Sequence, residues 1–98
     1  MKSGIRERTI EAKLVRKVKE LGGLCLKWVS PGWVGCPDRI LLLPDGRTVF
    51  VEVKRPGGKP TAIQLKRHEQ LKALSQQVEV VDSDTAIEEL LGRLFHES

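Results

Sequence analysis

The chain has 98 residues, of which 40% are hydrophobic and 31% are charged, and its net charge is +4. These values indicate one folded domain over residues 1–98 and exclude an intrinsically disordered protein. No apolar run approaches the roughly 20 residues of a membrane span, and the N-terminus lacks the apolar core of a signal peptide. We therefore expect no membrane partner and no export. Cys25 and Cys36 lack the spacing of a zinc site and are expected to be reduced thiols.

The positive charge is unevenly distributed along the chain. Residues 1–27 hold eight basic and three acidic side chains, and residues 54–72 hold six and one, whereas residues 73–98 hold one and six. Such an asymmetry favours a polyanionic partner, although for any single lysine a solvated surface is an equally good explanation.

A helix is predicted over residues 5–21, ended by Gly22-Gly23. Its apolar residues occupy one arc of a helical wheel, and Glu11 falls inside this arc. An inward carboxylate must be paired or bind a cation, because an isolated buried charge is costly. We therefore predict a site role for Glu11. The alternative is a position at the rim, or a pair with Lys27.

Residues 24–29 alternate in polarity and predict a strand. The loop 30–37 that follows is rich in glycine and proline and carries Trp33. Two roles are open to this tryptophan, which are packing on its own loop and stacking on nucleic acid.

Two acids and a lysine are predicted to converge at one end of a hairpin. A buried strand over residues 38–43 begins at Asp38, and a Pro-Asp-Gly turn leads to a return strand over residues 48–54. Glu52 and Lys54 share one face of that strand, because side chains two apart point the same way. Such a cluster is typical of a site that binds a divalent cation and cleaves phosphodiesters. A structural ion pair between Glu52 and Lys54 is the alternative.

A basic loop over residues 55–60 leads into a second helix over residues 61–75. Thr61, followed three residues later by Gln64, fits a capping box, which gives Gln64 a structural role. His68 lies beside the apolar stripe of this helix, where packing or a surface position is commoner than catalysis. The predicted site therefore does not include His68.

A short strand over residues 78–81 and an amphipathic helix from Asp84 complete the chain. The order αβββαβ plus a terminal helix predicts an α/β protein in which a mixed sheet is flanked by helices.

An ordered string of short motifs points to a known family. The motifs are GGL at 22–24, KWVSPG at 27–32, GCPDR at 35–39, PDG at 44–46, VEVKRPG at 51–57 and Gln64. This string closely resembles the VRR-NUC family of the PD-(D/E)XK nuclease superfamily, roughly over residues 10–82. The local departure is Cys36, where a small aliphatic residue is expected. The resemblance implies a restriction-endonuclease-like core.

The expected cofactor is Mg²⁺ or Mn²⁺. Mg²⁺ prefers oxygen ligands and supplies an activated water and charge neutralisation for phosphodiester hydrolysis. Asp38 and Glu52 are the predicted carboxylate ligands, and strand geometry brings the Val53 carbonyl near them. Glu11 would complete the ligand shell directly or through water.

The remaining catalytic roles fall to Lys54 and Gln64. Lys54 would orient or deprotonate the attacking water and offset charge on the phosphorane. The resemblance adds Gln64 as a residue that holds water or phosphate. The predicted DNA-contacting residues are Lys27, Ser30, Trp33, Arg39, Arg55, Lys59, Lys66 and Arg67.

The resemblance implies a metal-dependent, structure-selective DNA endonuclease in the cytoplasm of a bacterial or phage-infected cell. Stand-alone members of the family look like homodimers acting on four-way (Holliday) junctions, and a short chain gains from a partner that covers apolar surface. A chain of 98 residues leaves little room for an element that reads base edges. This makes a sequence-specific restriction enzyme a poorer fit. A flap- or nick-directed nuclease and a non-catalytic DNA-binding module are also compatible with the sequence.

Overall fold

The computed structural model describes residues 5–95. Its elements, in chain order, are α1 (Glu7–Glu20), β1 (Leu24–Lys27), β2 (Arg39–Leu42), β3 (Thr48–Val53), α2 (Ala62–Ala73), β4 (Gln77–Val81) and α3 (Asp84–Phe95). This confirms the predicted αβββαβ order with a terminal helix. The predicted strands were one or two residues too long at several ends. Trp28, for example, lies just beyond β1, although its N–H still bonds to the carbonyl of Asp38 at 2.9 Å.

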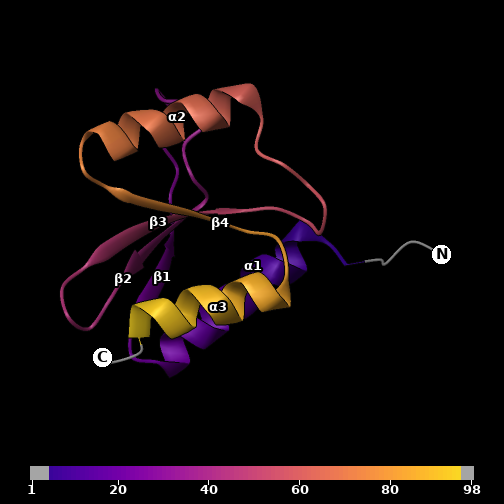
Figure 1. The fold of residues 1–98 in the computed structure, drawn as a ribbon, viewed down its shortest axis with the longest axis vertical. Coiled ribbons are helices and arrows are strands. Elements are labelled where there is room, and N and C mark those ends of the chain that lie inside the picture. Colours follow the sequence, from indigo (N-terminus) through magenta and orange to yellow (C-terminus); the bar gives the residue numbers. More distant parts are fainter. Residues whose placement is uncertain (1–4, 96–98) are drawn as a thin grey trace.

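The four strands form one mixed sheet in the order β1-β2-β3-β4. β1, β2 and β3 pair antiparallel with one another in sequence, and β4 pairs parallel to β3. A parallel pair needs a crossover connection, and α2 provides it. Figure 1 shows α2 on one face of the sheet and α1 with α3 on the other.

Turn residues take the conformations that the sequence predicts. Gly46 has a φ of +95°, the left-handed value expected for the glycine of the Pro-Asp-Gly turn. Gly23, just after α1, approaches β2 closely, because a Cβ at this position would lie 2.8 Å from the Leu42 carbonyl oxygen. Only glycine allows the chain to turn from α1 into β1 this near to the sheet.

The hydrophobic core lies between the sheet and the α1–α3 layer. Val49, Val51 and Val53 alternate along β3 and are fully buried, as the period of two predicts. The helices meet them with the buried side chains Ile10, Leu14, Val18, Ile87, Leu90, Leu91 and Leu94. Since these three valines face the core, the intervening residues Phe50 and Glu52 face the α2 side of the sheet.

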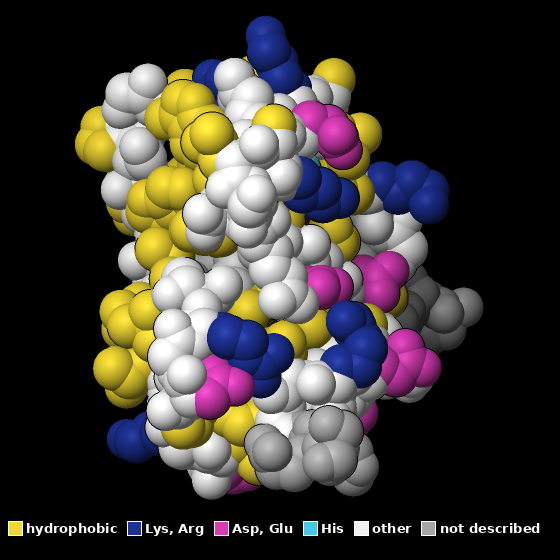
Figure 2. All heavy atoms as spheres, turned by 60° about the vertical axis from the view of Figure 1, so that its left-hand side comes forward, with side chains coloured by type: hydrophobic (Ala, Val, Ile, Leu, Met, Phe, Trp, Pro, Cys, Tyr) yellow, Lys and Arg dark blue, Asp and Glu magenta, His cyan; other side chains and the backbone are white. Residues whose placement is uncertain are grey.

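The α2 side of the sheet is only partly covered. Leu24, Leu26 and Leu42, on β1 and β2, remain 54%, 44% and 38% exposed. Figure 2 shows hydrophobic side chains gathered along one side of the molecule.

Two smaller findings concern the thiols and the helices. Cys25 and Cys36 are both free thiols, as predicted. Within residues 5–95, no helix is long and apolar enough to cross a membrane.

Candidate active site

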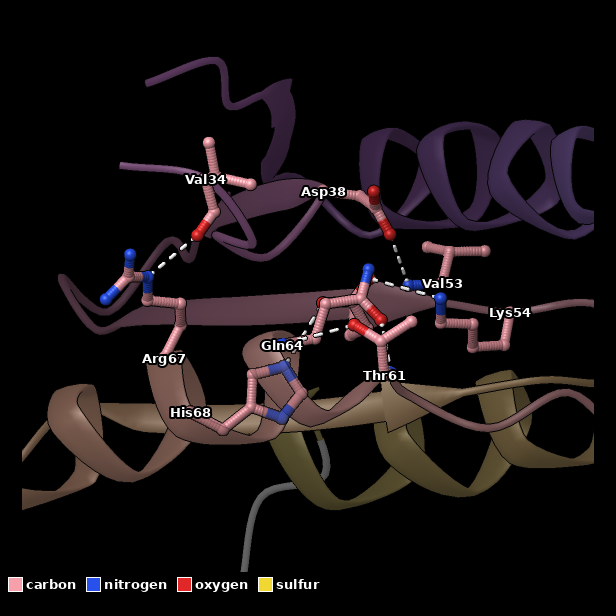
Figure 3. A network of polar contacts seen from close by, with 9 residues as sticks. Val34, Asp38, Val53, Lys54, Thr61, Gln64, Arg67 and His68 are labelled. Carbon is pink, nitrogen blue, oxygen red and sulfur yellow. Dashed lines mark hydrogen bonds and ion pairs between the residues drawn. The ribbon is translucent and has the colours of Figure 1, made fainter. Parts of the chain in front are cut away.

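Asp38 ties the start of β2 to the end of β3. It directly precedes β2, and its Oδ2 accepts a 2.7 Å hydrogen bond from the backbone N–H of Val53 (Figure 3). In the register of these strands Arg39 pairs with Val51, so one further step places Asp38 opposite Glu52. Residues opposite one another in an antiparallel pair carry side chains on the same face. The predicted convergence of the two acids therefore follows from the strand register.

Glu52 is a charged residue buried in full, with 0% of its surface exposed. Gln64 Nε2 donates to its Oε2 at 3.1 Å, and His68 Nε2 lies 3.1 Å from its Oε1. Burial, followed by the charge of the neighbouring Asp38 carboxyl, raises the pKa of Glu52 to about 8. The opposing contribution of Lys54 to this pKa is smaller. The folded site therefore disfavours a second negative charge unless a cation is supplied.

The donor set fits a divalent cation. Two adjacent carboxylates supply hard oxygen ligands, and their mutual repulsion is the feature that a bound cation would relieve. Within residues 5–95 no group of three or more His, Cys, Asp or Glu side chains is placed to hold a metal ion. A site built on Asp38 and Glu52 would therefore rely on two protein carboxylates. A site with two protein carboxylates suits Mg²⁺, which usually keeps several of its waters.

Lys54 lies beside this pair. Its Nζ is 4.0 Å from Glu52 Oε2, and its side chain is largely buried. The backbone N–H of Lys54 bonds to the Val81 carbonyl at 2.9 Å, which anchors the residue just beyond the end of β3. At 4.0 Å the ammonium is not locked in a short hydrogen bond to Glu52. It remains available to a group bound between the acids and itself.

Gln64 combines the two roles that the sequence left open for it. Its Oε1 accepts from the Thr61 N–H at 2.8 Å, and its own N–H donates to Thr61 Oγ1 at 3.3 Å, which completes a capping box. Its Nε2 is thereby directed to Glu52. One amide caps α2 with its oxygen and contacts the acid pair with its nitrogen.

His68 contacts the candidate site, although the sequence prediction left it out. It is 3% exposed and lies against Glu52, not at the surface. Burial, followed by the charge of Lys72, lowers the pKa of His68, which favours the neutral form of the ring. The available signal was the four-residue spacing from Gln64, which puts both side chains on one helical face.

Glu11 forms ion pairs with basic side chains, whereas the sequence prediction had it complete the ligand shell of the metal. Its Oε2 lies 2.6 Å from Arg39 Nε and 3.8 Å from Lys27 Nζ. The structure does not group Glu11 with Asp38 and Glu52, so it does not support Glu11 as a direct ligand. It supports the predicted alternative of an ion pair, in which Arg39 is a nearer partner than Lys27. Contact with a metal through water stays a prediction. Glu7, which no sequence motif singles out, is the α1 acid that adds to the raised pKa of Glu52.

Two of the predicted DNA-contacting residues, Trp33 and Arg67, make contacts with other residues of the protein. Trp33 packs against Trp28, just after β1, with ring centroids 5.8 Å apart, so its contact lies beside its own loop, and stacking on nucleic acid stays a prediction. The Arg67 guanidinium lies 4.9 Å from the Trp33 ring centroid, and its Nε donates to the Val34 carbonyl at 2.7 Å. Figure 3 shows this side chain reaching from α2 to the loop that precedes Asp38.

The remaining predicted contacts divide into engaged and exposed residues. Arg39 is engaged with Glu11, and its Nη1 also approaches the Cys25 carbonyl at 3.5 Å. Ser30 is half-buried, and its carbonyl accepts from the Trp33 N–H at 2.9 Å. The predicted phosphate contacts that remain exposed are Lys27, Arg55, Lys59 and Lys66.

Comparisons with known proteins agree with this geometry. No protein-family model matches the chain. It is 53% identical over 79 residues to "Putative nuclease p44" of Acyrthosiphon pisum secondary endosymbiont phage 1, an alignment that covers 81% of this chain and 85% of that protein. A solved structure of a VRR_NUC domain is similar with a TM-score of 0.83 and 31% sequence identity, covering 90% of this chain and 96% of the other. The chain therefore belongs to the VRR-NUC family of nucleases.

Proposed function

We propose that this protein is a metal-dependent, structure-selective DNA endonuclease that hydrolyses phosphodiesters. The observation that carries the proposal is the acid pair of half-buried Asp38 and buried Glu52, with Lys54 at its side. A structural module would have no need for two adjacent carboxylates when burial, followed by their repulsion, raises the pKa of Glu52 to about 8. A cation site does need them.

Each side chain of the site has a separate task. Asp38 and Glu52 bind the cation, and the Val53 carbonyl is the third proposed oxygen ligand. When bound, Mg²⁺ or Mn²⁺ supplies Lewis-acid polarisation of the phosphate and a more acidic water. Lys54 holds or deprotonates the attacking water and offsets charge that develops on the phosphorane. Gln64 offers its amide to water or phosphate at the mouth of the site.

DNA approaches through exposed cations. Arg55, Lys59 and Lys66 are exposed and can contact phosphates, as can Lys27, whose exposed ammonium also lies 3.8 Å from Glu11 Oε2. Such contacts make binding fall steeply with salt. They give no sequence information, because sequence is read at base edges. This favours a substrate recognised by shape.

We further propose a homodimer acting on four-way junctions in a bacterial or phage-infected cell. Large apolar side chains remain exposed on α2 and on the loop before Asp38, with Leu65 51% and Val34 69% exposed. A second copy would cover them. Two-fold assembly is the commonest oligomeric form, and it would present two equal sites to a junction of matching symmetry.

The test is cleavage of labelled DNA by the purified protein with Mg²⁺, Mn²⁺ or EDTA. An immobile four-way junction, a flap, a nicked duplex and a linear duplex are compared at equal concentration, with sedimentation at micromolar protein. Paired incisions in the junction by a dimer support the proposal. Cleavage of flaps or nicks alone would point to a flap- or nick-directed nuclease. Tight binding without cleavage in either metal would point to the non-catalytic module.

A further inference from the structure

Glu52 is held from α2 by two donors, one for each of its carboxylate oxygens. Gln64 Nε2 lies 3.1 Å from Oε2, and His68 Nε2 lies 3.1 Å from Oε1. The donors are four residues apart, and Figure 3 shows both side chains extending from α2 toward the strand that ends at Val53. To bind a cation Glu52 must be ionised, and an ionised carboxylate can only accept hydrogen bonds, so in that state His68 meets it as the tautomer with its proton on Nε2.

The two donors differ in what fixes them. Gln64 is oriented by the capping box with Thr61, at the partly exposed first turn of α2. His68 lies one turn further along and is 3% exposed. Water can replace a lost donor at the first position more easily than at the second, because the second is enclosed by protein.

A carboxylate needs such a clamp to be a good ligand. The terminal torsion of a glutamate side chain is soft, with a broad and roughly two-fold distribution. Hydrogen bonds to both oxygens fix the plane of the group and leave each oxygen a further lone pair for a cation. Partners that orient a ligand in this way commonly change metal affinity by about 10–100-fold when they are removed.

We propose that His68 is a positioning residue that sets the orientation of the Glu52 carboxylate for cation binding. This inference depends on the proposed function, since it assigns a role within the same site. It differs from a packing role, in which the imidazole merely fills the space between α2 and β3. The two roles separate when the volume of the side chain and its hydrogen-bond donor are varied independently.

Three substitutions vary them. His68→Gln places an amide nitrogen near the position of Nε2 and keeps the donor. His68→Asn is polar but too short to reach Glu52, and His68→Leu fills the space without a donor. Leu71→Ala is the packing control, because Leu71 is buried on the same helix but is not among the hydrogen-bond partners of Glu52.

The readout is Mn²⁺ binding to the full-length protein by titration calorimetry without DNA, together with the melting temperature of the metal-free protein. We expect His68→Asn and His68→Leu to weaken Mn²⁺ binding about 10–100-fold, and His68→Gln to restore most of it. Leu71→Ala should lower the melting temperature and leave the affinity for Mn²⁺ unchanged. If His68→Leu does not fold, the comparison of asparagine with glutamine decides.

The outcomes separate this inference from the proposed function. The positioning role would be overturned if His68→Asn bound Mn²⁺ as tightly as the wild type, or if Leu71→Ala lost as much Mn²⁺ affinity as His68→Asn. The proposed function would survive either result as long as the wild type binds Mn²⁺ and cleaves DNA. A wild-type protein that binds no Mn²⁺, or that binds it equally well after Asp38→Asn, would overturn both.

Discussion

Asp38 and Glu52 stand opposite one another on adjacent strands, so the residue before β2 and the penultimate residue of β3 form one acid pair. Their side chains differ in what holds them. Asp38 is fixed by the backbone N–H of Val53, whereas Glu52 is fixed by side chains from α2. The site is therefore assembled from the sheet on one side and from the crossover helix on the other.

Asp38→Asn should abolish cleavage and keep the fold. The amide oxygen of asparagine can still accept the hydrogen bond from Val53 N–H, whereas alanine would leave this N–H without its acceptor. The melting temperature of Asp38→Asn should therefore change little. The loss of one negative charge removes a cation ligand. Cleavage of a labelled junction with Mn²⁺, beside a thermal melt, checks this. Substantial cleavage by the variant would remove Asp38 from the ligand set.

Glu52 should make the metal-free protein lose stability as pH rises. Its folded pKa of about 8 lies above the ordinary value of 4.5, so the folded state binds the proton more tightly than the unfolded state does. This contribution is fully present below about pH 4.5 and is lost as the pH rises toward 8. One pKa unit is worth about 1.4 kcal/mol, so the loss amounts to a few kcal/mol.

The Glu52→Gln variant isolates this effect. It should be more stable than the metal-free wild type at pH 8 and nearly equal to it at pH 4.5. Neutral His68 can accept the new amide N–H by changing its tautomer, so the hydrogen-bond network survives. Chemical denaturation across this pH range measures the difference, and added Mn²⁺ should stabilise only the wild type. A gap that does not change with pH would show that Glu52 is not the titrating group.

Lys54→Met should lower turnover by roughly 10²–10⁴, the range expected for a positioned proton-transfer or electrostatic group. DNA affinity should change much less, because exposed cations elsewhere carry the phosphate contacts. Methionine keeps the length of the buried stem. Single-turnover cleavage and equilibrium binding on the same junction separate the two effects. Unchanged turnover would reduce Lys54 to a structural partner of Glu52.

Glu11→Gln should destabilise the protein, because it replaces the charged partner of the partly buried Arg39 guanidinium, 2.6 Å away, with a neutral amide. A loss of about 1–3 kcal/mol is reasonable for a buried group that loses a charged hydrogen bond. A double-mutant cycle with Arg39→Met should show that the two residues are coupled by about 1 kcal/mol or more. A gain in stability, as expected for a carboxylate strained in the absence of metal, would instead return Glu11 to the ligand shell.

The sequence predicted the parts of this site that depend on local spacing. Strand alternation placed Glu52 and Lys54 on one face, and the motif Thr61-x-x-Gln64 predicted a capping box that the structure contains. It could not rank the partners of Glu11, because the distance to Arg39 depends on how α1 packs across β1 and β2. The sequence prediction left His68 out of the site for a similar reason. The side of α2 that faces the sheet covers the Glu52 carboxylate, so a polar side chain such as His68 fits there better than an apolar one.

Two neighbours on α2 provide the last test, because they carry the same charge in different surroundings. Lys66 is exposed, whereas Arg67 clamps the loop before Asp38 through Trp33 and the Val34 carbonyl. Lys66→Ala should weaken DNA binding, reduce the salt slope by about one and leave the melting temperature unchanged. Arg67→Ala should lower the melting temperature, because the clamp is lost.

The clamp also links Arg67 to turnover. The loop that it holds leads directly into Asp38, so loosening it should displace a cation ligand and slow cleavage at saturating DNA. Arg67→Lys keeps the charge but cannot reproduce the planar contact with Trp33 together with the bond to Val34. It should therefore resemble Arg67→Ala in turnover and in melting temperature. If Arg67→Lys instead behaves as the wild type while Arg67→Ala loses DNA affinity, Arg67 acts as a phosphate contact and the clamp is incidental.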